Sequence, residues 1–376
     1  MSRGMLVNIV INDFTNDSRV LKSSKSLSEL GYDVKVVAMH NQGLPETEQE
    51  NGFAVQRIKL VSRGWSKQKF VQIVKYLEFV VRAFFTCFKS NALHCNDLNA
   101  LPIGVLIKIF RFGSPRLVYD AHEYETELKD LKGIEKTLKK ILERFLIPFA
   151  DEVITVSNSI SDEYARIYNI KKPKVVLNCP YYINEQRHDV FRKELGIRED
   201  QVIFLYQGGL SKGRGIEILL ESFKKSSNHK HVLVCMGYGP LEDLVREEAD
   251  KHPSIYFYPA VSPQVLLTYT SSADFGILFY EDVCLNHRFC SPNKMFEYLM
   301  AGIPVIASNL FEMKRLVEKY EVGVVAVRND PEGFGLAVQK AMAADYDLLT
   351  KNVSTVRKQF CWEEQQKILQ EAYIGS

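Results

Sequence analysis

Short apolar runs alternate along the chain with longer segments in which apolar residues recur at helical spacing. In the first half these runs predict strands at Met5–Ile11, Val34–Ala38, Val55–Lys59, Ala92–Cys95, Arg116–Asp120, Glu152–Val156 and Lys174–Asn178. Asp17–Leu30 has the helical period, and the following Gly31 suits a helix C-terminus. Strands that alternate with helices are typical of βαβ units and a parallel sheet.

The alternation breaks at Asn178–Gln186, which holds a proline and shows little periodicity. It restarts with predicted strands at Val202–Tyr206, His231–Met236, Ile255–Tyr258, Phe275–Leu278, Pro304–Ala307 and Gly323–Ala326. We therefore predict an α/β fold with two doubly wound domains, residues 1–182 and 188–358. A helix in 359–376 should pack back towards the N-terminal domain. Ligands bind at the carboxyl ends of such strands, so we expect a site in a central cleft that the two sheets face.

Composition narrows the class of protein. A length of 376 residues suits two domains, and a formal net charge of +2 gives no reason to expect a nucleic-acid partner. The seven cysteines include no C-x-x-C pair, so we expect free thiols in a reducing compartment and no zinc site. The first apolar run is too short for a signal peptide, and the sequence has no stretch long enough to span a membrane, so we expect a cytoplasmic protein.

Two glycine-rich segments follow predicted strands in the second half. In Tyr206–Gly215 the glycines allow close backbone approach at a helix N-terminus, and Arg214 can bind a phosphate through two hydrogen bonds. The alternative is a tight turn with solvated basic residues. Met236–Pro240 carries a weaker signal of the same kind, for which an ordinary glycine-rich turn is the alternative.

A third segment, Cys290–Ser308, opens a helix with Ser291 as the expected N-cap and Pro292 at the first helical position. Lys294 lies in the first turn, where a cation opposes the helix dipole, so it indicates an anion nearby. Glu297 lies on the same helix and can accept hydrogen bonds from two hydroxyls, as a ribose presents. A capped helix with solvated charges is the alternative.

Together these segments resemble those of retaining glycosyltransferases of the GT4 family, which have the GT-B fold of two Rossmann-like domains. The matching segments are GGLSKGRGIEILLESF, MGYGPLEDL, SSADFGI and SPNKMFEYLMAGIPVIAS in the second half, and NDSRVLKSSKSLSELGYDVKVVA, HCNDLNALPIG, LVYDAHEYE and ADEVITVSNSI in the first. The resemblance covers nearly the whole chain. It implies transfer of a sugar from a nucleotide-sugar donor, by the family's habits a UDP-sugar, to a glycan or lipid-linked glycan acceptor in polysaccharide biosynthesis. It also implies that no metal or other cofactor is needed.

The resemblance assigns residues in the second half to the donor. Arg214 matches the basic residue that binds the diphosphate, Lys294 assists the backbone N–H groups of its helix, and Glu297 matches the glutamate that holds the ribose and counts among the catalytic candidates. The full implied donor set is Gly208, Gly209, Arg214, Gly237, Ser291, Pro292, Asn293, Lys294 and Glu297. The family's other glutamate falls at Phe289, a departure for which Glu281 or Asp282 could substitute.

In the first half, His122 matches a family histidine at the sugar end of the cleft and is the second catalytic candidate. The alternative is a histidine satisfied by the backbone at a strand end. The candidates for the acceptor side or the cleft are Asn16, Arg19, Asn96 and Asp97. No glutamate is clearly placed as a nucleophile, so we expect attack on the face of the leaving group. One D-x-D, Asp345–Asp347, lies at a late helix boundary and is not expected to bind a cation.

Two other functions remain open from the sequence. Because Phe289 replaces a family glutamate, the protein could be a non-catalytic nucleotide-sugar-binding protein. The same fold also occurs in sugar-nucleotide epimerases. Residues 63–89 combine six basic residues with one acidic residue and many apolar ones, a composition typical of a helix that binds an anionic membrane surface. The alternative is a helix whose apolar face packs on the sheet. If the membrane interpretation holds, the protein lies at the inner face of the cell membrane.

Overall fold

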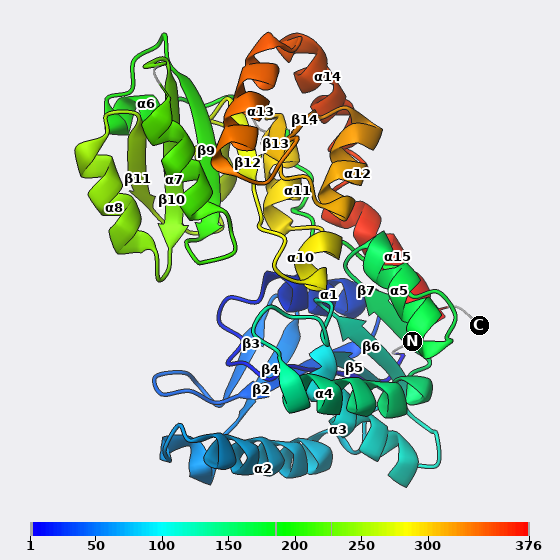
Figure 1. Ribbon diagram of the computed structural model, residues 1–376. Helices are drawn as coiled ribbons and strands as arrows, with labels where there is room; N and C mark the ends of the chain where they lie inside the picture. Colours follow the sequence, from blue (N-terminus) through cyan, green and yellow to red (C-terminus); the bar gives the residue numbers. More distant parts are fainter. Residues whose placement is uncertain (1–2, 185, 227, 375–376) are drawn as a thin grey trace. The chain divides into compact units, whose positions relative to one another are not determined.

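The structure is a computed structural model that describes residues 3–184, 186–226 and 228–374. The chain divides into two compact units (Figure 1). The first comprises Met1–Val176 together with Gln366–Ser376, and the second comprises Leu177–Gln365. The first unit therefore ends a few residues before the boundary at 182 that the sequence suggests, and it takes up the end of the C-terminal helix.

The first unit is built on an eight-stranded sheet. Its strands are β1 (Met5–Ile9), β2 (Asp33–Met39), β3 (Thr47–Glu50), β4 (Phe53–Ile58), β5 (Ala92–Asn96), β6 (Arg116–Ala121), β7 (Glu152–Thr155) and β8 (Lys174–Val175). They lie in the order β3-β4-β2-β1-β5-β6-β7-β8, and β3 alone pairs antiparallel. The parallel strands are nearly continuous apolar runs because helices cover both faces.

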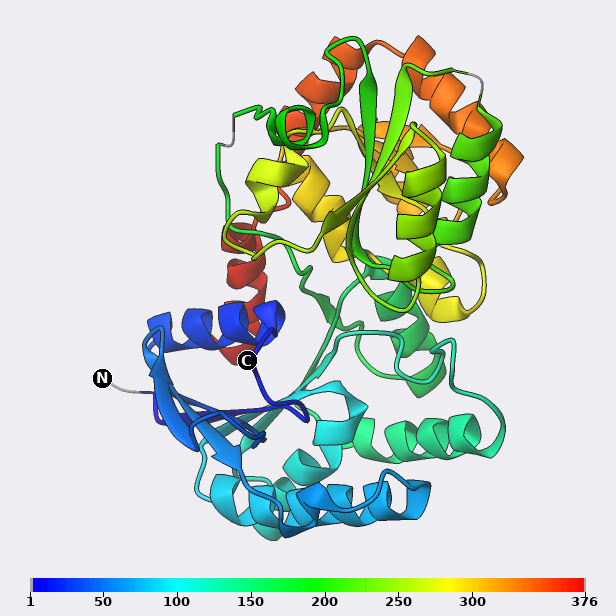
Figure 2. The same cartoon turned by 90° about the vertical axis from the view of Figure 1, so that its left-hand side faces the viewer.

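The helices of this unit lie in two layers. They are α1 (Ser18–Glu29), α2 (Lys69–Cys87), α3 (Asp97–Phe110), α4 (Gly133–Leu146), α5 (Asn158–Tyr168) and the end of α15 (Trp362–Ile374), with single turns η1 (Val61–Gly64) and η2 (Ile147–Phe149). Figures 1 and 2 show α1 on one face of the sheet and α2, α3 and α4 on the other. The end of α15 lies beside α1, where Gln370 donates a hydrogen bond to the Ser26 carbonyl.

The second unit is a six-stranded, wholly parallel sheet. Its strands are β9 (Val202–Gly209), β10 (His231–Tyr238), β11 (Ile255–Pro259), β12 (Phe275–Leu278), β13 (Val305–Ala307) and β14 (Gly323–Val325), in the order β11-β10-β9-β12-β13-β14. Its helices are α6 (Val190–Leu195), α7 (Ile216–Lys225), α8 (Glu242–Lys251), α9 (Leu266–Thr270), α10 (Leu285–Phe289), α11 (Asn293–Met300), α12 (Phe311–Tyr320), α13 (Pro331–Ala343) and α14 (Tyr346–Val356). The order reverses direction at β9, which is the switch point where doubly wound sheets bind ligands.

The predicted α/β fold with two doubly wound sheets is confirmed, with local differences. Strand β3 was missed because its sequence, TEQE, lacks apolar residues; it is the exposed antiparallel edge of the sheet. Lys174–Asn178 forms only the two-residue strand β8. Strand β9 runs beyond Tyr206 and takes the first two loop glycines into the sheet.

Candidate functional site

The carboxyl ends of β9 and β10 pair in the second unit with no room for a side chain at Gly237. A Cβ atom on Gly237 would lie 1.9 Å from the carbonyl oxygen of Gly208, so only glycine fits there. Gly208 itself has φ +112°, which glycine adopts without strain, and it is exposed together with Gly209. The glycine-rich segments thus keep side chains away from this edge and leave the backbone accessible.

Helix α11 begins beside this edge, one residue later than the sequence indicates. Pro292 occupies the N-cap position, and Ser291 is not the cap. Proline pre-sets the extended backbone before the first turn but has no side-chain acceptor to offer, so the helix starts without a side-chain cap. The Ser291 hydroxyl is buried and, among the residues that the structure describes, has no hydrogen-bond partner.

Lys294, in the first turn of α11, is buried, with 6% of its surface exposed. The alternative interpretation, in which the charge of Lys294 is solvated, is therefore wrong. Its Nζ has no hydrogen-bond partner within the described parts of the chain and lies 3.7 Å from the centroid of the Tyr206 ring. Burial, and secondarily the positive charge of Arg214, holds the pKa of Lys294 well below its usual range.

Arg214 brings a second cation to the same place. Its guanidinium donates a 2.6 Å hydrogen bond to the Tyr280 hydroxyl and lies 5.0 Å from the centroid of that ring. The Nζ of Lys294 lies 5.4 Å from the same centroid. Two basic side chains therefore share one aromatic ring at the carboxyl edge of the sheet, and the charge of Arg214 disfavours the protonated form of Lys294.

Glu297 is the carboxylate nearest to this pair along α11, and its negative charge partly offsets the lowering of the pKa of Lys294. Its Oε2 accepts a 2.6 Å hydrogen bond from the amide of Gln207, at the end of β9. Gln207 in turn accepts a hydrogen bond from Thr270, which fixes its orientation. Gln207 is a residue that the sequence did not single out; its place just before the glycines was the available signal.

Glu281 contacts the glycine loop, although the two are far apart in the sequence. Its carboxylate accepts a 3.1 Å hydrogen bond from the backbone of Gly213, and its own N–H donates to the carbonyl of the same residue. Asp282 instead pairs with Arg288 on the surface. Phe289 ends α10 and contacts the ring of Phe311, so it is an apolar contact at the position where the resemblance implies a carboxylate.

Three candidate residues of the first unit, Asn96, Asp97 and His122, lie at the carboxyl ends of β5 and β6. His122 Nε2 lies 3.0 Å from Asn96 Oδ1, and Asp97 Oδ1 accepts a 3.1 Å hydrogen bond from the His122 backbone. Asn96 is oriented by hydrogen bonds from its amide to Asn8 and to the Ile9 carbonyl. The His122 side chain is thus held by side chains, and the alternative in which the backbone satisfies it is not what the structure shows.

The charge state of His122 follows from its neighbours. Its Nδ1 lies 3.7 Å from Asp97 and its Nε2 lies 3.5 Å from Asp120. Burial alone would lower the pKa of His122, but these two carboxylates outweigh it and raise the pKa above its usual value. The structure therefore favours an imidazolium at this position.

Arg19 is placed inside the first unit. Its guanidinium makes two hydrogen bonds to Asp120, of 2.7 and 2.9 Å, and a third to the Val176 carbonyl. Both side chains are almost fully buried. Despite burial, Arg19 and the adjacent His122 hold the pKa of Asp120 well below its usual range. Arg19 thus positions Asp120, and through it His122, while its own donors are directed into the protein.

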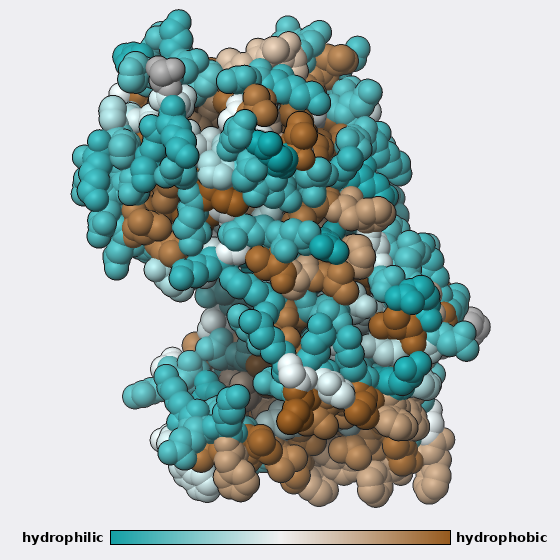
Figure 3. Space-filling view, viewed as in Figure 1, coloured by the Kyte–Doolittle hydropathy of each residue, from teal (hydrophilic) through white to brown (hydrophobic). Residues whose placement is uncertain are grey.

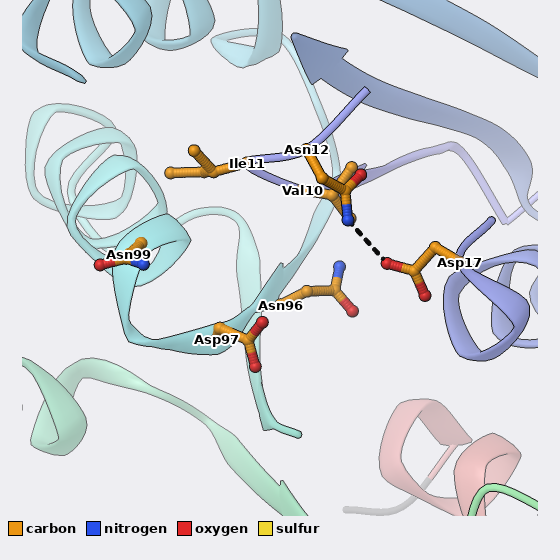
Figure 4. A pocket seen from close by; sticks show the side chains of 7 residues that line it. All are labelled: Val10, Ile11, Asn12, Asp17, Asn96, Asp97 and Asn99. Atoms are coloured by element: carbon orange, nitrogen blue, oxygen red, sulfur yellow. Dashed lines mark hydrogen bonds between the residues drawn. The ribbon is translucent and has the colours of Figure 1, made fainter. Parts of the chain in front are cut away.

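A small pocket lies beside these residues (Figure 4). Asn12 and Asp17 line it from the chain after β1, and Asn96 and Asp97 line it from the end of β5. Asp17 also caps α1 by accepting a hydrogen bond from the Val20 backbone. Asn16 lies next to this region and is exposed.

Glu125 is a buried carboxyl that the sequence did not single out. Burial, together with the charge of Asp97 to which it is hydrogen-bonded, raises the pKa of Glu125 well above its usual range. This shift favours the protonated form of Glu125, which can donate to Asp97. Asp345 of the D-x-D accepts from the Leu348 backbone and caps α14. Across the described residues, no helix is both long and apolar enough to cross a membrane.

Comparisons with known proteins agree with this arrangement. The family model for glycosyl transferases group 1 matches residues 188–359, and the family model for glycosyltransferase family 4 matches residues 18–180. An uncharacterised glycosyltransferase of Methanocaldococcus jannaschii is 24% identical over 345 residues, which cover 85% of this chain and 83% of that protein.

Solved structures share the fold over the whole chain. Sucrose-phosphate synthase of Thermosynechococcus elongatus superposes with a TM-score of 0.79 at 17% identity, covering 99% of this chain and 98% of that one. HepE of Anabaena, in complex with UDP-glucose, superposes with a TM-score of 0.73 at 14% identity, covering 98% and 99%. Each half of the chain thus matches its own glycosyltransferase description, and the protein belongs to the family 4 and group 1 glycosyltransferases with the GT-B fold.

Proposed function

We propose that this glycosyltransferase takes its sugar from a nucleoside-diphosphate sugar, a UDP-sugar, and transfers it with retention to a glycan or lipid-linked glycan. The observation that carries the donor part is the pair Arg214 and Lys294. The Nζ of Lys294 has no hydrogen-bond partner among the described residues, and keeping it as a buried ammonium beside Arg214 costs several kcal/mol unless an anion compensates the charge. A diphosphate supplies two or more negative charges and many acceptor oxygens.

The surrounding groups suit the rest of a nucleotide. The exposed backbone at Gly208 and Gly209 and the start of α11 allow close approach of phosphate oxygens. Glu297, oriented by Gln207, can accept hydrogen bonds from ribose hydroxyls. The uridine preference is supported by HepE, whose structures hold UDP-glucose or UDP, whereas a starch synthase of the same fold holds ADP.

The proposed reaction breaks the bond between the anomeric carbon and the diphosphate oxygen, which keeps the electron pair. Arg214 and Lys294 stabilise the developing negative charge. The acceptor hydroxyl oxygen forms the new bond on the same face, and its proton passes to the departing phosphate oxygen. Phe289 offers no carboxylate as a nucleophile, which supports attack from the face of the leaving group. His122, as an imidazolium, would hydrogen-bond a hydroxyl of the transferred sugar or an oxygen of the leaving group.

The acceptor part of the proposal is a lipid-linked glycan for cell-surface polysaccharide. One of the solved structures with this fold, WaaG, is a glycosyltransferase involved in lipopolysaccharide biosynthesis. Such an acceptor places the enzyme in the cytoplasm, at the inner face of the cell membrane. No metal or other cofactor is required by this scheme, because the two cations and the backbone N–H groups provide the electrostatic stabilisation.

The donor site is tested by titration calorimetry with UDP. Arg214→Ala should weaken binding by about 1.5–3 kcal/mol, the range for a hydrogen bond to a charged group. Arg198→Ala, which removes an exposed arginine paired with Asp200 in the same unit, is the matched control and should bind UDP as the wild type does. Equal affinities of wild type and Arg214→Ala would remove the donor assignment.

Transfer is separated from mere binding by His122→Ala. If His122 acts in the transition state, this variant should lower turnover by roughly ten- to a thousand-fold while leaving UDP affinity nearly unchanged. Turnover is read as release of UDP from a panel of UDP-sugars. A wild-type protein that binds UDP but neither hydrolyses nor transfers any donor would instead be a non-catalytic nucleotide-sugar-binding protein. That is the alternative that follows from Phe289 standing in place of the family's glutamate.

A further inference from the structure

Helix α4 has its apolar side turned outwards. Within α4, all of whose residues the structure describes, the buried side chain is that of Glu143. Ile134, Leu138 and Phe145 recur at helical spacing and are 80%, 60% and 71% exposed. A helix that covers a sheet normally buries its apolar stripe and presents polar residues to solvent, so this orientation needs an explanation.

The orientation is fixed by hydrogen bonds to Glu143. Its carboxylate accepts from the hydroxyls of Tyr119, Tyr164 and Tyr168, at 2.6, 2.7 and 2.5 Å. Burial raises the pKa of Glu143, and the three tyrosine hydroxyls oppose that rise. The helix is thus attached to the sheet and to α5 through a polar residue, which leaves its apolar stripe free of the core.

Helix α2 repeats the pattern on a larger scale. It packs inwards through Phe79, Val80 and Ala83, whereas other large apolar side chains face solvent. The exposed ones on α2 are Phe70, Ile73, Leu77, Val81 and Phe85. Helix α2 therefore packs one apolar side inwards, as the alternative interpretation expects, and turns a second apolar side to solvent.

Helix α3 lies between these two helices and completes a continuous surface. Phe110, at its end, contacts the ring of Phe84 on α2 at 5.5 Å and is itself exposed, and Phe112 just beyond it is 99% exposed. We call the outward side chains of α2, α4 and the end of α3 the apolar plate. Figure 3 shows apolar side chains gathered along the lower edge of the first unit, over the helices that Figure 1 labels α2, α3 and α4.

Basic residues outnumber acidic ones in the segments that carry the apolar plate. Residues 63–89 hold six basic residues and one acidic residue, and residues 129–146 hold six basic and three acidic ones. One of those acids is the buried Glu143. The acid on α2, Glu78, accepts hydrogen bonds from the backbone of Val61 and Ser62 and from Arg82, so its charge is engaged within the protein.

We infer that the apolar plate is a docking surface for an anionic lipid bilayer. Exposed apolar and aromatic side chains on helices with an excess of basic residues are the composition of interfacial helices that insert into the headgroup region. A second copy of the chain fits less well, because it would bring two positively charged surfaces together. The inference extends the membrane-binding segment from residues 63–89 to α4 and the end of α3, and it does not depend on the proposed transfer reaction.

The test is co-sedimentation of the full chain with vesicles of phosphatidylglycerol and phosphatidylcholine, at low and at high salt. The wild type should bind vesicles that contain phosphatidylglycerol, and less so at high salt because exposed charges are screened. Leu138→Ser with Phe145→Ser, which alters α4 alone, should lower the partition coefficient at least about tenfold. Leu336→Ser with Val327→Ser, which removes exposed apolar residues of the second unit, is the matched control and should bind as the wild type does.

Two results would overturn the inference. One is vesicle binding by the α4 variant equal to that of the wild type. The other is a wild type that light scattering shows to be a dimer and an α4 variant that is a monomer, which would make the plate an interface between copies. Arg214→Ala serves as a further comparison: it should lose UDP affinity and keep vesicle binding, so failure of the donor site and failure of the docking surface are distinguished.

Discussion

Lys294 illustrates at the scale of one residue how burial and charge combine into a function. It lies almost fully inside the second unit, with a ring below its ammonium and Arg214 nearby. Both burial and the neighbouring cation disfavour its protonated form. A diphosphate at this place would reverse that preference, because an opposite charge within a few ångströms favours the ammonium.

This reversal predicts that UDP binding takes up protons. In the free protein the pKa of Lys294 is lowered, and in the complex it is raised, so uptake occurs at pH values between the two. Calorimetry in buffers of different ionisation enthalpy measures it. Lys294→Met should bind UDP with less uptake than the wild type, which also corrects for protons carried by UDP itself. The same proton count in both proteins, or greater uptake in the variant, would contradict the assignment.

The sequence predicts residue types at the site better than their surroundings. The glycines, Arg214, Lys294 and Glu297 were singled out as candidates because they follow predicted strands, and because they match the motifs of the family. Gln207, Tyr280 and Glu125 were missed. Their importance comes from contacts with residues distant in the sequence, such as Arg214 with Tyr280 across 66 positions, and no local pattern announces such contacts. Arg19 was expected at the acceptor side or in the cleft because the sequence does not reveal its ion pair with Asp120, which lies 101 positions away.

At the scale of the element, β9 and β10 can pair up to their ends because the glycines there carry no side chains. Gly237→Ala would place a methyl group 1.9 Å from the Gly208 carbonyl oxygen, and the two strand ends would have to separate. We expect a loss of about 1–3 kcal/mol of stability, the usual range for overpacking. Urea unfolding followed by fluorescence measures the change in midpoint.

Gly209→Ala is the matched control. Its added Cβ would have no described heavy atom within 4 Å, and its φ is not in the left-handed region. Its midpoint should differ little from that of the wild type. Equal midpoints for the two variants would show that the close approach of the strand ends does not limit stability.

Helices and strands with a clear period were predicted well, and elements decided by their partners were not. The helical period of Asp17–Leu30 corresponds to α1, with Asp17 as its cap and Gly31 just beyond its end. Strand β3 has no apolar pattern because it lies at an edge. For α2, the sequence revealed apolar residues but not which of them face the sheet, since an apolar residue looks the same in the core and on a docking surface.

At the scale of the whole molecule, the repeated alternation of strands and helices was sufficient to predict two parallel sheets. The boundary between the units was harder to place. The first unit ends at Val176 and resumes at Gln366, within α15, so it is assembled from the two ends of the chain. A linear sequence shows a linker at 178–186, but nothing in the local composition of α15 shows that its second half belongs to the first unit.

That division has a consequence for synthesis on the ribosome, which proceeds from the N-terminus. The first unit needs Tyr373, whose hydroxyl lies 2.6 Å from Nδ1 of the buried His94, and the Ala372 carbonyl, which accepts from Arg116. The nascent chain can complete the second unit, residues 177–365, as soon as it has left the exit tunnel. The first unit, although made earlier, must wait for residues 366–374 to emerge, with His94 and Arg116 lacking these partners until then. The half that is translated first is therefore the half that is finished last.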